Sequence, residues 1–405
     1  MTDSRIGPGM EAAVDFSLRW ASGVAHHEEH AHVPRFVFDR DIVPTAVDNQ
    51  LDGLAAGQDV NFTVDAEALG LTMDDSDRHQ VPRAAFQLAT EPDAVTTPAI
   101  GRYYPAGFLA GMPGVSEDDR RPARCVGVTD DELTFDLNHP FAGRSGELSV
   151  SVGRVEAVAP GLDGRRREWV AELLAGPGRQ ARIETDVPTD FWEADAFRRS
   201  DEAPDPDFYG APRIVQHIDD RAIQVAGAVY GRLIPAGGSV LDLMSSHVSH
   251  LPADLQLSTV AGLGMNEVEL NANRRLTDPV VHDLNADPVL PFADETFDAV
   301  ICTVSVDYLT RPFEVFAEVR RILKKDGVFA VTFSNRWFPT KVVRVWERLQ
   351  EFERLGLVSE YFLRSGLFRD IHTFSQRGLP RPPDDPYYSQ MLVADPVYAV
   401  WGRPA

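Results

Sequence analysis

The chain has 405 residues, which exceeds the size of one ordinary hydrophobic core and indicates two or three domains. Hydrophobic residues make up 43% of it, which is typical of a globular protein and excludes a disordered one. The formal net charge of −23 argues against binding to nucleic acid, because an acidic surface repels phosphates.

The sequence also bears on where the protein resides. We find no run of about 18 consecutive apolar residues, so we expect neither a membrane span nor a membrane partner. The first residues, MTDSRIGPGMEAAVDF, lack the basic and then apolar segments of a secretory signal. The two cysteines, Cys125 and Cys302, lie far apart in the chain and are expected to stay reduced. Together these features predict a cytoplasmic protein.

Residues 10–158 are predicted to be rich in β-strands. Short alternating or apolar runs such as DVNFTVDA, LTFDL and LSVSVGRVEAV are separated by Gly, Pro, Asn and Asp turns. Residues 159–205 differ in composition, with the charged or Gly-rich pieces GLDGRRRE and AGPGRQ around one expected helix near Trp169–Leu174. Such a composition is typical of a linker.

In residues 206–403, predicted strands and helices alternate. In chain order we expect a helix over 214–233, strands over 239–244 and 259–265, a helix over 267–275, strands over 280–284 and 297–305, a helix over 312–323, a turn over 324–327 and a strand over 328–334. This alternation predicts a doubly wound α/β domain, whose parallel sheet is covered on both faces. Ligands of such sheets bind at the carboxyl ends of the strands, near the point where the strand order reverses.

Four segments of this region carry a family resemblance: VLDLMSSHVSH, STVAGLGMNEVEL, VVHDLNADPVLPFADETFDAVICTVSVDYL and FEVFAEVRRILKKDGVFAVTFSN. In order and spacing they resemble the Rossmann-like domain of class I methyltransferases, of the type 11-like group, that depend on S-adenosyl-L-methionine (SAM). The resemblance implies an enzyme that binds SAM and transfers its methyl group to an acceptor. The four segments do not reveal the acceptor.

The resemblance also assigns residues to the cofactor. It implies that Asp242 holds the amino-acid head of SAM, that Asp283 and Leu284 lie along the adenine, and that Cys302, Thr303 and Val304 line the methionine moiety. From its residue type alone, we expect Cys302 to be a small buried residue in any case. The full set of expected cofactor residues is Asp242, Ser245, Ser246, Gly264, Met265, Asn266, Asp283, Leu284, Thr303 and Val304. Two plainer alternatives are that Asp242 caps a following helix and that Asp283 is only a turn residue.

The loop after the first strand departs from the family pattern. The family's loop is Gly-rich, whereas Met244, Ser246 and Val248 occupy the corresponding positions here. A non-glycine residue with positive φ costs about 1–2 kcal/mol. We therefore expect the loop to follow another path, on which Ser245 or Ser246 offers a hydroxyl group to the cofactor.

The end of the second strand departs as well. The acidic residue with which the family binds the ribose hydroxyls aligns with Gly264. We expect Asn266, Glu267 or Glu269, from the turn that follows, to replace it.

The resemblance further implies that Ser305, Asp307 and Tyr308 face the substrate side. For the chemistry itself, Asp307 and Tyr308 are the candidate catalytic residues, since a carboxylate or a phenol can act as an acid or a base; His217 and Asn335 are further candidates by position. The histidines 247 and 250 lack a third ligand at suitable spacing, so we expect no metal. The run PYYSQ, at 386–390, is either part of a lid or a surface turn.

A second resemblance lies in the N-terminal region. The segment FDLNHPFAGRSGELSVSVGRVEAV, at 135–158, resembles the end of FKBP-type prolyl isomerases of the SlyD type. The resemblance implies a domain over 10–158 with an insertion over about 70–135. It further implies a pocket in which Ile42 and Val43 form the floor and Leu51 a wall, and which binds unfolded or proline-containing peptides. The alternative is that these three residues belong to a hydrophobic core.

This pocket also departs from its family. The aromatic pocket positions align with Leu69 and Leu148, and the segment VAHHEEHAHVP, at 24–34, replaces an Asp-containing loop. We interpret 24–34 as a polar surface loop; a metal site formed by its histidines and glutamates is the alternative. Isomerase activity is therefore expected to be weak or absent. The leading hypothesis is a SAM-dependent methyltransferase fused to a peptide-binding domain, and the alternative is a chaperone-like peptidyl-prolyl isomerase or binding protein with a degenerate methyltransferase fold.

Overall fold

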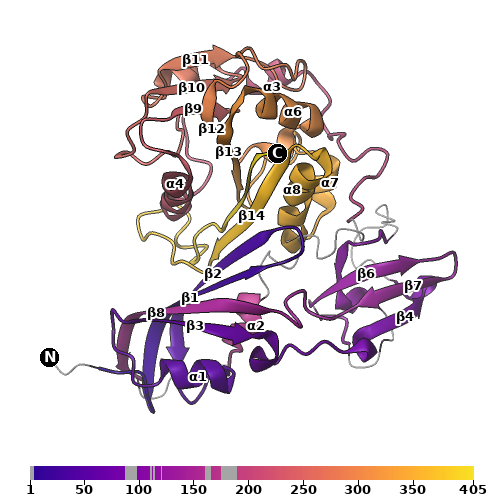
Figure 1. Ribbon diagram of the computed structural model, residues 1–405, viewed down its shortest axis with the longest axis vertical. Helices are drawn as coiled ribbons and strands as arrows, with labels where there is room; N and C mark the ends of the chain where they lie inside the picture. Colours follow the sequence, from indigo (N-terminus) through magenta and orange to yellow (C-terminus); the bar gives the residue numbers. More distant parts are fainter. Residues whose placement is uncertain are drawn as a thin grey trace. The chain divides into compact units, whose positions relative to one another are not determined.

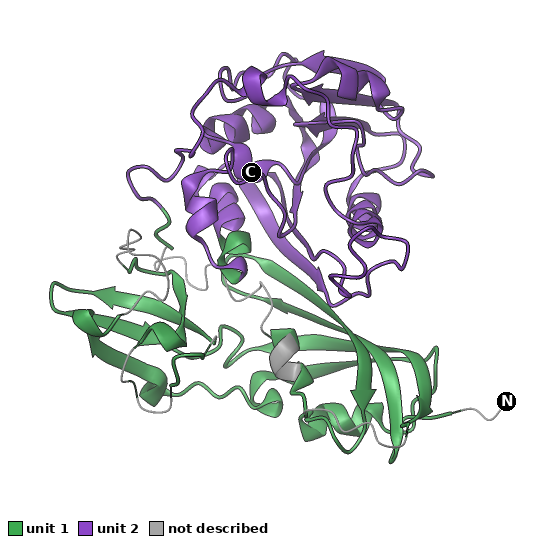
Figure 2. Ribbon diagram, turned by 180° about the vertical axis from the view of Figure 1, so that it is seen from behind, with its two compact units in different colours: residues 1–191, 352–356 green, residues 192–351, 357–405 purple. Residues whose placement is uncertain are grey.

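The computed structural model describes residues 4–86, 98–109, 112, 115–119, 121–159, 166–174 and 189–405. The chain divides into two compact units (Figure 2), namely 1–191 with 352–356 and 192–351 with 357–405. Residues 160–165 and 175–188 of the expected linker and 87–97 of the expected insertion lie outside the described residues. In the described parts of the chain, we find no helix with both the length and the apolar character needed to cross a bilayer.

The main sheet of the first unit is antiparallel (Figure 1), with the order β2-β1-β8-β3. Its strands are β1 (Met10–Ala21), β2 (His26–Val37), β3 (Asp59–Asp65) and β8 (Ser145–Ala157), and its helices are α1 (Thr45–Leu51) and α2 (Trp169–Leu174). One face of the sheet packs onto these helices around Phe16, Val150 and Trp169. The predicted β-rich character of this region and the predicted helix at 169–174 are both confirmed.

A second antiparallel sheet of the first unit has its own core. Its order is β4-β7-β6-β5, with strands β4 (Arg78–Pro82), β5 (Tyr103–Pro105), β6 (Pro122–Val128) and β7 (Glu132–Asp136). Short 3-10 turns accompany the two sheets: η1 (Ala66–Leu69), η2 (Asp75–Asp77), η3 (Arg83–Ala85) and η4 (Ala106–Phe108). Buried Tyr104, Cys125 and Phe135 form the centre of this core, which lies in the region of the expected insertion.

The interpretation of residues 24–34 as a polar surface loop is wrong, because most of them belong to strand β2. Their polar side chains find partners on β1. The indole nitrogen of Trp20 donates to Oε1 of buried Glu29 at 3.1 Å, and the ring of His32 contacts Asp15 at 2.8 Å. Charged residues are in general rare in strands, so the composition of this segment argued against a strand. Cross-strand partners on β1 make the strand favourable here.

The second unit is built on one twisted sheet with the order β11-β10-β9-β12-β13-β15-β14. Its strands are β9 (Ser239–Leu243), β10 (Thr259–Gly264), β11 (Asp278–Val281), β12 (Phe297–Thr303), β13 (Leu323–Phe333), β14 (Phe368–Arg377) and β15 (Val397–Pro404). Strands β9 to β13 are parallel, and β15 runs antiparallel to both β13 and β14. The chain moves outward from β9 to β11 and returns beside β9 as β12, which confirms the doubly wound α/β fold.

Helices cover both faces of this sheet. They are α3 (Asp205–Tyr209), α4 (Asp220–Leu233), α5 (Glu267–Ala272), the 3-10 turn η6 (Val306–Tyr308), α6 (Pro312–Ile322), α7 (Arg344–Arg348) and α8 (Glu351–Ser365). Tyr230 of α4 packs against Ala330 of β13 on one face. On the other face, the rings of Phe316 from α6 and Phe362 from α8 contact Phe329, the neighbour of Ala330 on β13.

Two predicted boundaries in this unit are wrong. The helix expected from residue 214 begins only at Asp220, because the carboxylate of Asp219 accepts the backbone N–H of Ala222 at 2.9 Å and caps it there. The turn expected at 324–327 is part of β13, which pairs with β12 across a register shift. Strands β14 and β15 and helices α7 and α8 had no counterpart in the sequence-based expectations.

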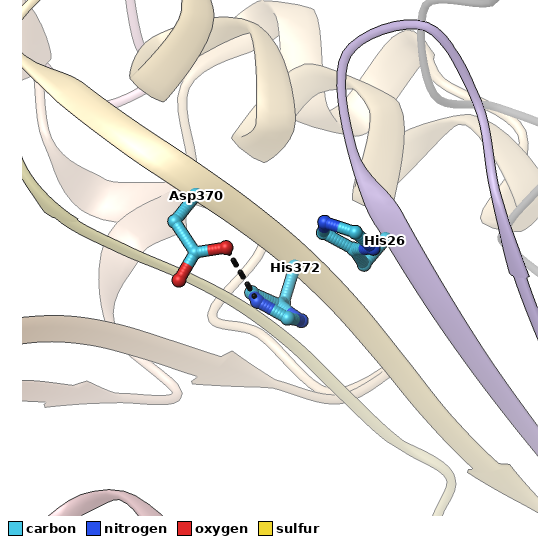
Figure 3. A group of neighbouring side chains, drawn as sticks. All are labelled: His26, Asp370 and His372. Carbon is cyan, nitrogen blue, oxygen red and sulfur yellow. Dashed lines mark hydrogen bonds and ion pairs between the residues drawn. The ribbon is translucent and has the colours of Figure 1, made fainter.

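Strand β14 contains an irregularity that brings two polar side chains together. Its pairing with β15 shifts between Arg369 and His372, and Asp370 adopts a left-handed φ of +54°. The ring of His372 donates a hydrogen bond to the Asp370 carboxylate at 3.1 Å (Figure 3) and stacks on Trp401. Because of this bulge, β14 has one residue more than β15 over the same stretch, and the side chains of Asp370 and His372 lie within hydrogen-bonding distance.

Candidate functional site

The carboxyl ends of β9, β10, β11 and β12 converge on one cavity of about 840 Å³. Each of these strands contributes polar or small residues just where it ends. All ten expected cofactor residues line this cavity: Asp242, Ser245, Ser246, Gly264, Met265, Asn266, Asp283, Leu284, Thr303 and Val304. The site therefore lies at the strand ends beside the point where the sheet order reverses, as such folds place their ligands.

Asp242 presents a buried carboxylate at the end of β9. It is 2% exposed, and its Oδ2 accepts a hydrogen bond from the Ser245 hydroxyl at 2.6 Å. Burial raises the pKa of Asp242 to about 6, and the hydrogen bond from Ser245 opposes part of that shift. Residues 244–258, all of them described, contain no helix, so the alternative that Asp242 caps a helix is wrong.

The expectation that the loop after β9 avoids positive φ is also wrong. Met244 adopts φ of +59°, and Val304 and His250 adopt +44° and +54°. All three line the cavity. The backbone N–H of Ser245 donates to the Leu263 carbonyl at 2.7 Å, which helps to hold the loop against a cost of about 1–2 kcal/mol per strained residue. Backbone strain that gathers around one cavity is characteristic of functional sites.

Gly264 ends β10 where the same loop crosses it. A Cβ atom at this position would lie 2.1 Å from the backbone oxygen of Ser245, closer than two such atoms can approach. The acidic side chain that the family places here therefore does not fit beside this loop. The two departures seen in the sequence, a Gly-poor loop and a missing acid, are one structural feature.

The turn after Gly264 supplies other polar groups. Glu269 lines the cavity, where its carboxylate accepts from the Ser246 hydroxyl and from the backbone N–H of Arg213, both at 2.6 Å. Asn266 lines it too, but its side-chain oxygen caps α5 by accepting from the backbone of Val268 at 3.0 Å. The third expected substitute, Glu267, is not among the lining residues.

At the end of β11, Asp283 combines the two roles considered for it. Its Oδ1 accepts from the backbone N–H groups of Asn285 at 3.0 Å and Ala286 at 3.1 Å, so it does hold a turn. It also lines the cavity next to buried Leu284. The turn thus fixes the position of a carboxylate at the cavity wall.

At the end of β12, Tyr230 of α4 holds Thr303 in place. Its hydroxyl lies 2.6 Å from the hydroxyls of both Thr303 and Thr332. Cys302, expected to face the methionine moiety, is instead buried in the sheet outside the lining, as its alternative interpretation as a small buried residue predicted. Burial raises the pKa of its thiol, so the group stays protonated.

The two candidate catalytic residues differ in position. Tyr308 lines the cavity together with Ser305, whereas Asp307 is buried outside the lining, so the expectation that Asp307 faces the substrate is wrong. Burial and the charge of Asp307 raise the pKa of Tyr308 well above its usual value, so the phenol stays protonated near neutral pH. The other candidates divide too, since His217 lines the cavity and Asn335 does not.

Sequence reasoning missed the salt-bridged cluster at the far end of the cavity. Arg381, 3% exposed, contacts the carboxylates of Asp395 at 2.7 Å and of Asp219 and Asp385 at 3.3 Å. Asp219 and Asp395 also exchange hydrogen bonds through their backbone N–H groups. This cluster attaches the connection between β14 and β15 to the start of α4, where Asp384, Pro386 and Tyr387 complete the wall.

The structure separates the three residues expected to bind peptides in the first unit. Leu51 is fully buried in the core of the main sheet, together with Leu69 and Leu148. Val43 packs against that core, whereas Ile42 is 39% exposed. Leu51 is thus a core residue, and only Ile42 presents a substantial apolar surface.

Comparison with known proteins bears on the second unit. Residues 245–331, from the loop after β9 to β13, match a family described as "Methyltransferase domain". The second unit contains a methyltransferase domain. At the level of that family, the match implies SAM as the cofactor.

Similar proteins are distant. A curated relative, the biotin biosynthesis bifunctional protein BioHC of Teredinibacter turnerae, is 31% identical over 67 residues, which are 16% of this chain and 12% of that protein. A solved SAM-dependent methyltransferase from Aquifex aeolicus is 15% identical and aligns over 46% of this chain and 94% of its own, with a TM-score of 0.31. A TehB-like SAM-dependent methyltransferase from Corynebacterium glutamicum is 14% identical and aligns over 44% and 86%, with a TM-score of 0.28. The chain therefore spans about an eighth of the length of the curated relative.

Replacing Gly264 with Ala tests the crossing in the methyltransferase domain. The new methyl group would collide with the Ser245 backbone, so we expect Gly264→Ala to lower the free energy of unfolding by about 1–3 kcal/mol. Gly153→Ala in β8 is the control, because the nearest atoms there would lie at 3.6 and 3.8 Å, in ordinary contact. Urea unfolding of both variants gives the comparison, and equal stabilities would contradict the crossing.

Asp242→Asn tests the buried carboxylate through pH. Because folding raises the pKa of Asp242 to about 6, its contribution to stability is full in acid and is lost as the pH rises through that value. We expect the change in unfolding free energy caused by Asp242→Asn to be more stabilising near pH 7.5 than near pH 4.5, by about 2 kcal/mol. Urea unfolding at both pH values measures it. A change in unfolding free energy that does not depend on pH would show that the Asp242 carboxylate is solvated. The matched control is Asp278→Asn, because Asp278 is exposed and lies outside the cavity.

Proposed function

We propose that the protein is a SAM-dependent methyltransferase that acts on an acceptor bound in the cavity of the second unit. The observation that carries this proposal is the gathering of Asp242, Asp283 and Thr303, from three strand ends, around one cavity inside a methyltransferase domain. The volume of about 840 Å³ lies within the range of about 300–1,000 Å³ that small-molecule sites span.

The residues fit SAM at its two ends. The Asp242 carboxylate, buried at the cavity and bound by the Ser245 hydroxyl, suits the ammonium group of the amino-acid head. Asp283 and Leu284 offer a carboxylate beside an apolar surface, as an adenine requires. When bound, SAM supplies a methyl group on a positively charged sulfur.

The middle of the cofactor has a different setting from the family's. Gly264 leaves no acid at the end of β10, and the nearest replacement, Glu269, already binds Ser246 and the backbone of Arg213. We propose that Glu269 receives the ribose hydroxyls on its remaining acceptor positions. A carboxylate has about four of them, so two existing hydrogen bonds leave room for more.

On the acceptor side, this chain supplies residues that position the acceptor. Ser305 and Tyr308 follow β12 into the cavity, and the Tyr308 hydroxyl accepts the backbone N–H of Phe338 at 2.8 Å, which fixes the ring. A phenol kept protonated orients the acceptor by hydrogen bonding. Most of the rate of an in-line methyl transfer can come from such positioning.

Calorimetry with SAM and with its demethylated product, S-adenosylhomocysteine, tests the proposal directly. We expect both ligands to bind. Asp242→Asn should weaken the binding of SAM by about tenfold or more, because a charge-assisted contact with the ammonium group is lost. Asp278→Asn serves as the control and should leave the affinity unchanged. Urea unfolding of Asp242→Asn under the same conditions shows whether the variant is folded, so a loss of affinity can be separated from unfolding. An absence of binding heat with millimolar SAM would reject the proposal.

For the first unit we propose weak binding of unfolded or proline-containing peptides, by a domain related to FKBP-type prolyl isomerases. What supports this is the four-stranded antiparallel sheet over α1, the separately packed sheet β4-β7-β6-β5, and the exposed side chain of Ile42. Because Leu69 and Leu148 are core residues rather than aromatic pocket walls, we expect binding without isomerisation.

Fluorescence anisotropy of a labelled proline-rich peptide on the full chain tests this second proposal. Ile42→Asp should weaken the binding of the peptide. Ile214→Asp, at a comparably exposed isoleucine of the second unit, should leave the affinity unchanged. A parallel prolyl-isomerisation assay should show the uncatalysed rate. No binding by the unaltered protein would reject peptide recognition. Suppression of client aggregation, together with no SAM binding, would instead favour the chaperone-like alternative.

A further inference from the structure

Part of the cavity lining comes from segments other than the strand ends proposed for the cofactor, and we call this part the acceptor wall. It is formed by the chain after β13, by the connection between β14 and β15, and by the segment before α4. The lining residues from these segments include Trp337, Phe338, Asp384 and Tyr387, with Asp220 from the start of α4. These are aromatic and acidic side chains on one wall.

From this wall we infer that the methyl acceptor is a small molecule with a positively charged ammonium group. The inference rests on the proposed methyltransferase function and adds the chemical class of the acceptor. Three features of the cavity support it: its charge, its aromatic surface and a histidine whose ring nitrogens are buried without a partner among the described residues.

The cavity wall carries a large excess of negative charge. Nine carboxylates line it, against three guanidinium groups: Asp205, Asp219, Asp220, Asp242, Glu269, Asp283, Asp384, Asp385 and Asp395, against Arg213, Arg336 and Arg381. Burial lowers the pKa of His250 to about 4 and also lowers the pKa of His217, so these rings stay neutral near pH 7 and add no positive charge.

Ion pairs account for only part of this charge. Arg381 engages Asp219, Asp385 and Asp395, and Asp205 pairs outside the cavity with Arg199 at 2.7 Å. In the part of the chain that the structure describes, the remaining carboxylates form no ion pair: Asp220, Asp242, Glu269, Asp283 and Asp384. SAM brings a net charge of about +1, which leaves several carboxylates unneutralised. Exposed Asp220 and Asp384 belong to the acceptor wall.

The aromatic faces beside these carboxylates already attract cations. The Arg213 guanidinium lies 4.4 Å from the ring centre of Phe208 and 5.4 Å from that of Phe338, and the Arg336 guanidinium lies 5.6 Å from that of Tyr387. Cations bind over aromatic rings through the negative face of the ring. A ligand with an ammonium group can use Tyr387 and Asp384 together, since they lie on the same short segment.

His250 indicates that the cavity receives a polar ligand. Both of its ring nitrogens are buried, and neither has a hydrogen-bond partner among the described residues. Buried polar atoms of this kind are rare in proteins unless water or a ligand satisfies them. Its backbone, with φ of +54°, is also strained, so folding carries a cost to keep this ring at the cavity.

The ammonium group cannot itself be the atom that is methylated, because it has no lone pair. In the transfer, a lone pair on another atom of the acceptor forms the new bond to the methyl carbon, and the S–CH₃ bond breaks with its electron pair going to sulfur. If the attacking atom carries a proton, that proton leaves to solvent. The charged group therefore serves recognition, at a distance from the reacting atom.

Calorimetry of the full chain with two isosteric probes tests the inference. Choline and its uncharged isostere 3,3-dimethylbutan-1-ol differ in charge but hardly in shape. With S-adenosylhomocysteine present, we expect choline to bind about tenfold more tightly or better, and added salt to weaken choline selectively. Equal affinities, tighter binding of the isostere, or no choline binding at any soluble concentration would overturn the inference.

Variants at the wall sharpen the test. Asp384→Asn should weaken the binding of choline about fivefold and leave the affinity for the isostere unchanged. Tyr387→Leu, which keeps an apolar side chain, should have the same effect on both affinities. Asp278→Asn should alter neither probe. Unchanged choline affinity in both wall variants would also overturn the inference. SAM calorimetry on the unaltered protein separates the two proposals. An absence of SAM binding rejects the methyltransferase function, whereas SAM binding without a preference for choline over its isostere rejects only the acceptor class.

Discussion

The close passage of the loop after β9 over the end of β10 is the constraint on which the cofactor end of the cavity depends. The backbone oxygen of Ser245 occupies the space that a side chain at position 264 would need. Gly264 is therefore required for steric reasons, and the acid that would otherwise extend from this strand has to come from elsewhere. In the proposed function, Glu269 from the first turn of α5 takes that place, and the hydroxyl of Ser246 binds to it.

The same loop explains how a site can form without a glycine-rich turn. Left-handed backbone at Met244 costs about 1–2 kcal/mol, a cost that glycine would avoid. Hydrogen bonds at the next two residues offset it: Ser245 binds both the Leu263 carbonyl and the carboxylate of Asp242, and the Ser246 hydroxyl binds Glu269. The serine hydroxyls thus support the loop and the buried acid, rather than only facing the ligand as a sequence-based interpretation suggested.

Negative charge is the second physical theme of the cavity. Arg381 gathers three carboxylates at the far end, and this cluster attaches the β14–β15 connection to the first turn of α4. Elsewhere on the wall, carboxylates such as Asp384 form no ion pair with any residue that the structure describes. A site that keeps unpaired acids around a cavity gives up stability in the free protein and gains attraction for cations, first of all for the sulfonium of the proposed cofactor.

The sequence by itself determined the class of the second unit and the order of most of its elements. Alternating apolar strands and amphipathic helices from Val240 to Phe333 left little choice of fold, because hydrophobic periodicity is local and survives in a single sequence. The strand-end residues followed from that fold, since the carboxyl ends of parallel strands meet at one edge of a sheet.

Only the tertiary structure decided the rest, and the reason is the same in each case. The strand over 26–37 depends on partners such as Asp15 that lie on another strand, and the acceptor wall depends on Arg381, which is far from Asp219 in the chain. Such contacts join residues that are distant in sequence, so no local pattern announces them. What the sequence showed as two separate departures, at Met244 and Gly264, became one feature only when the backbone path across β10 was known.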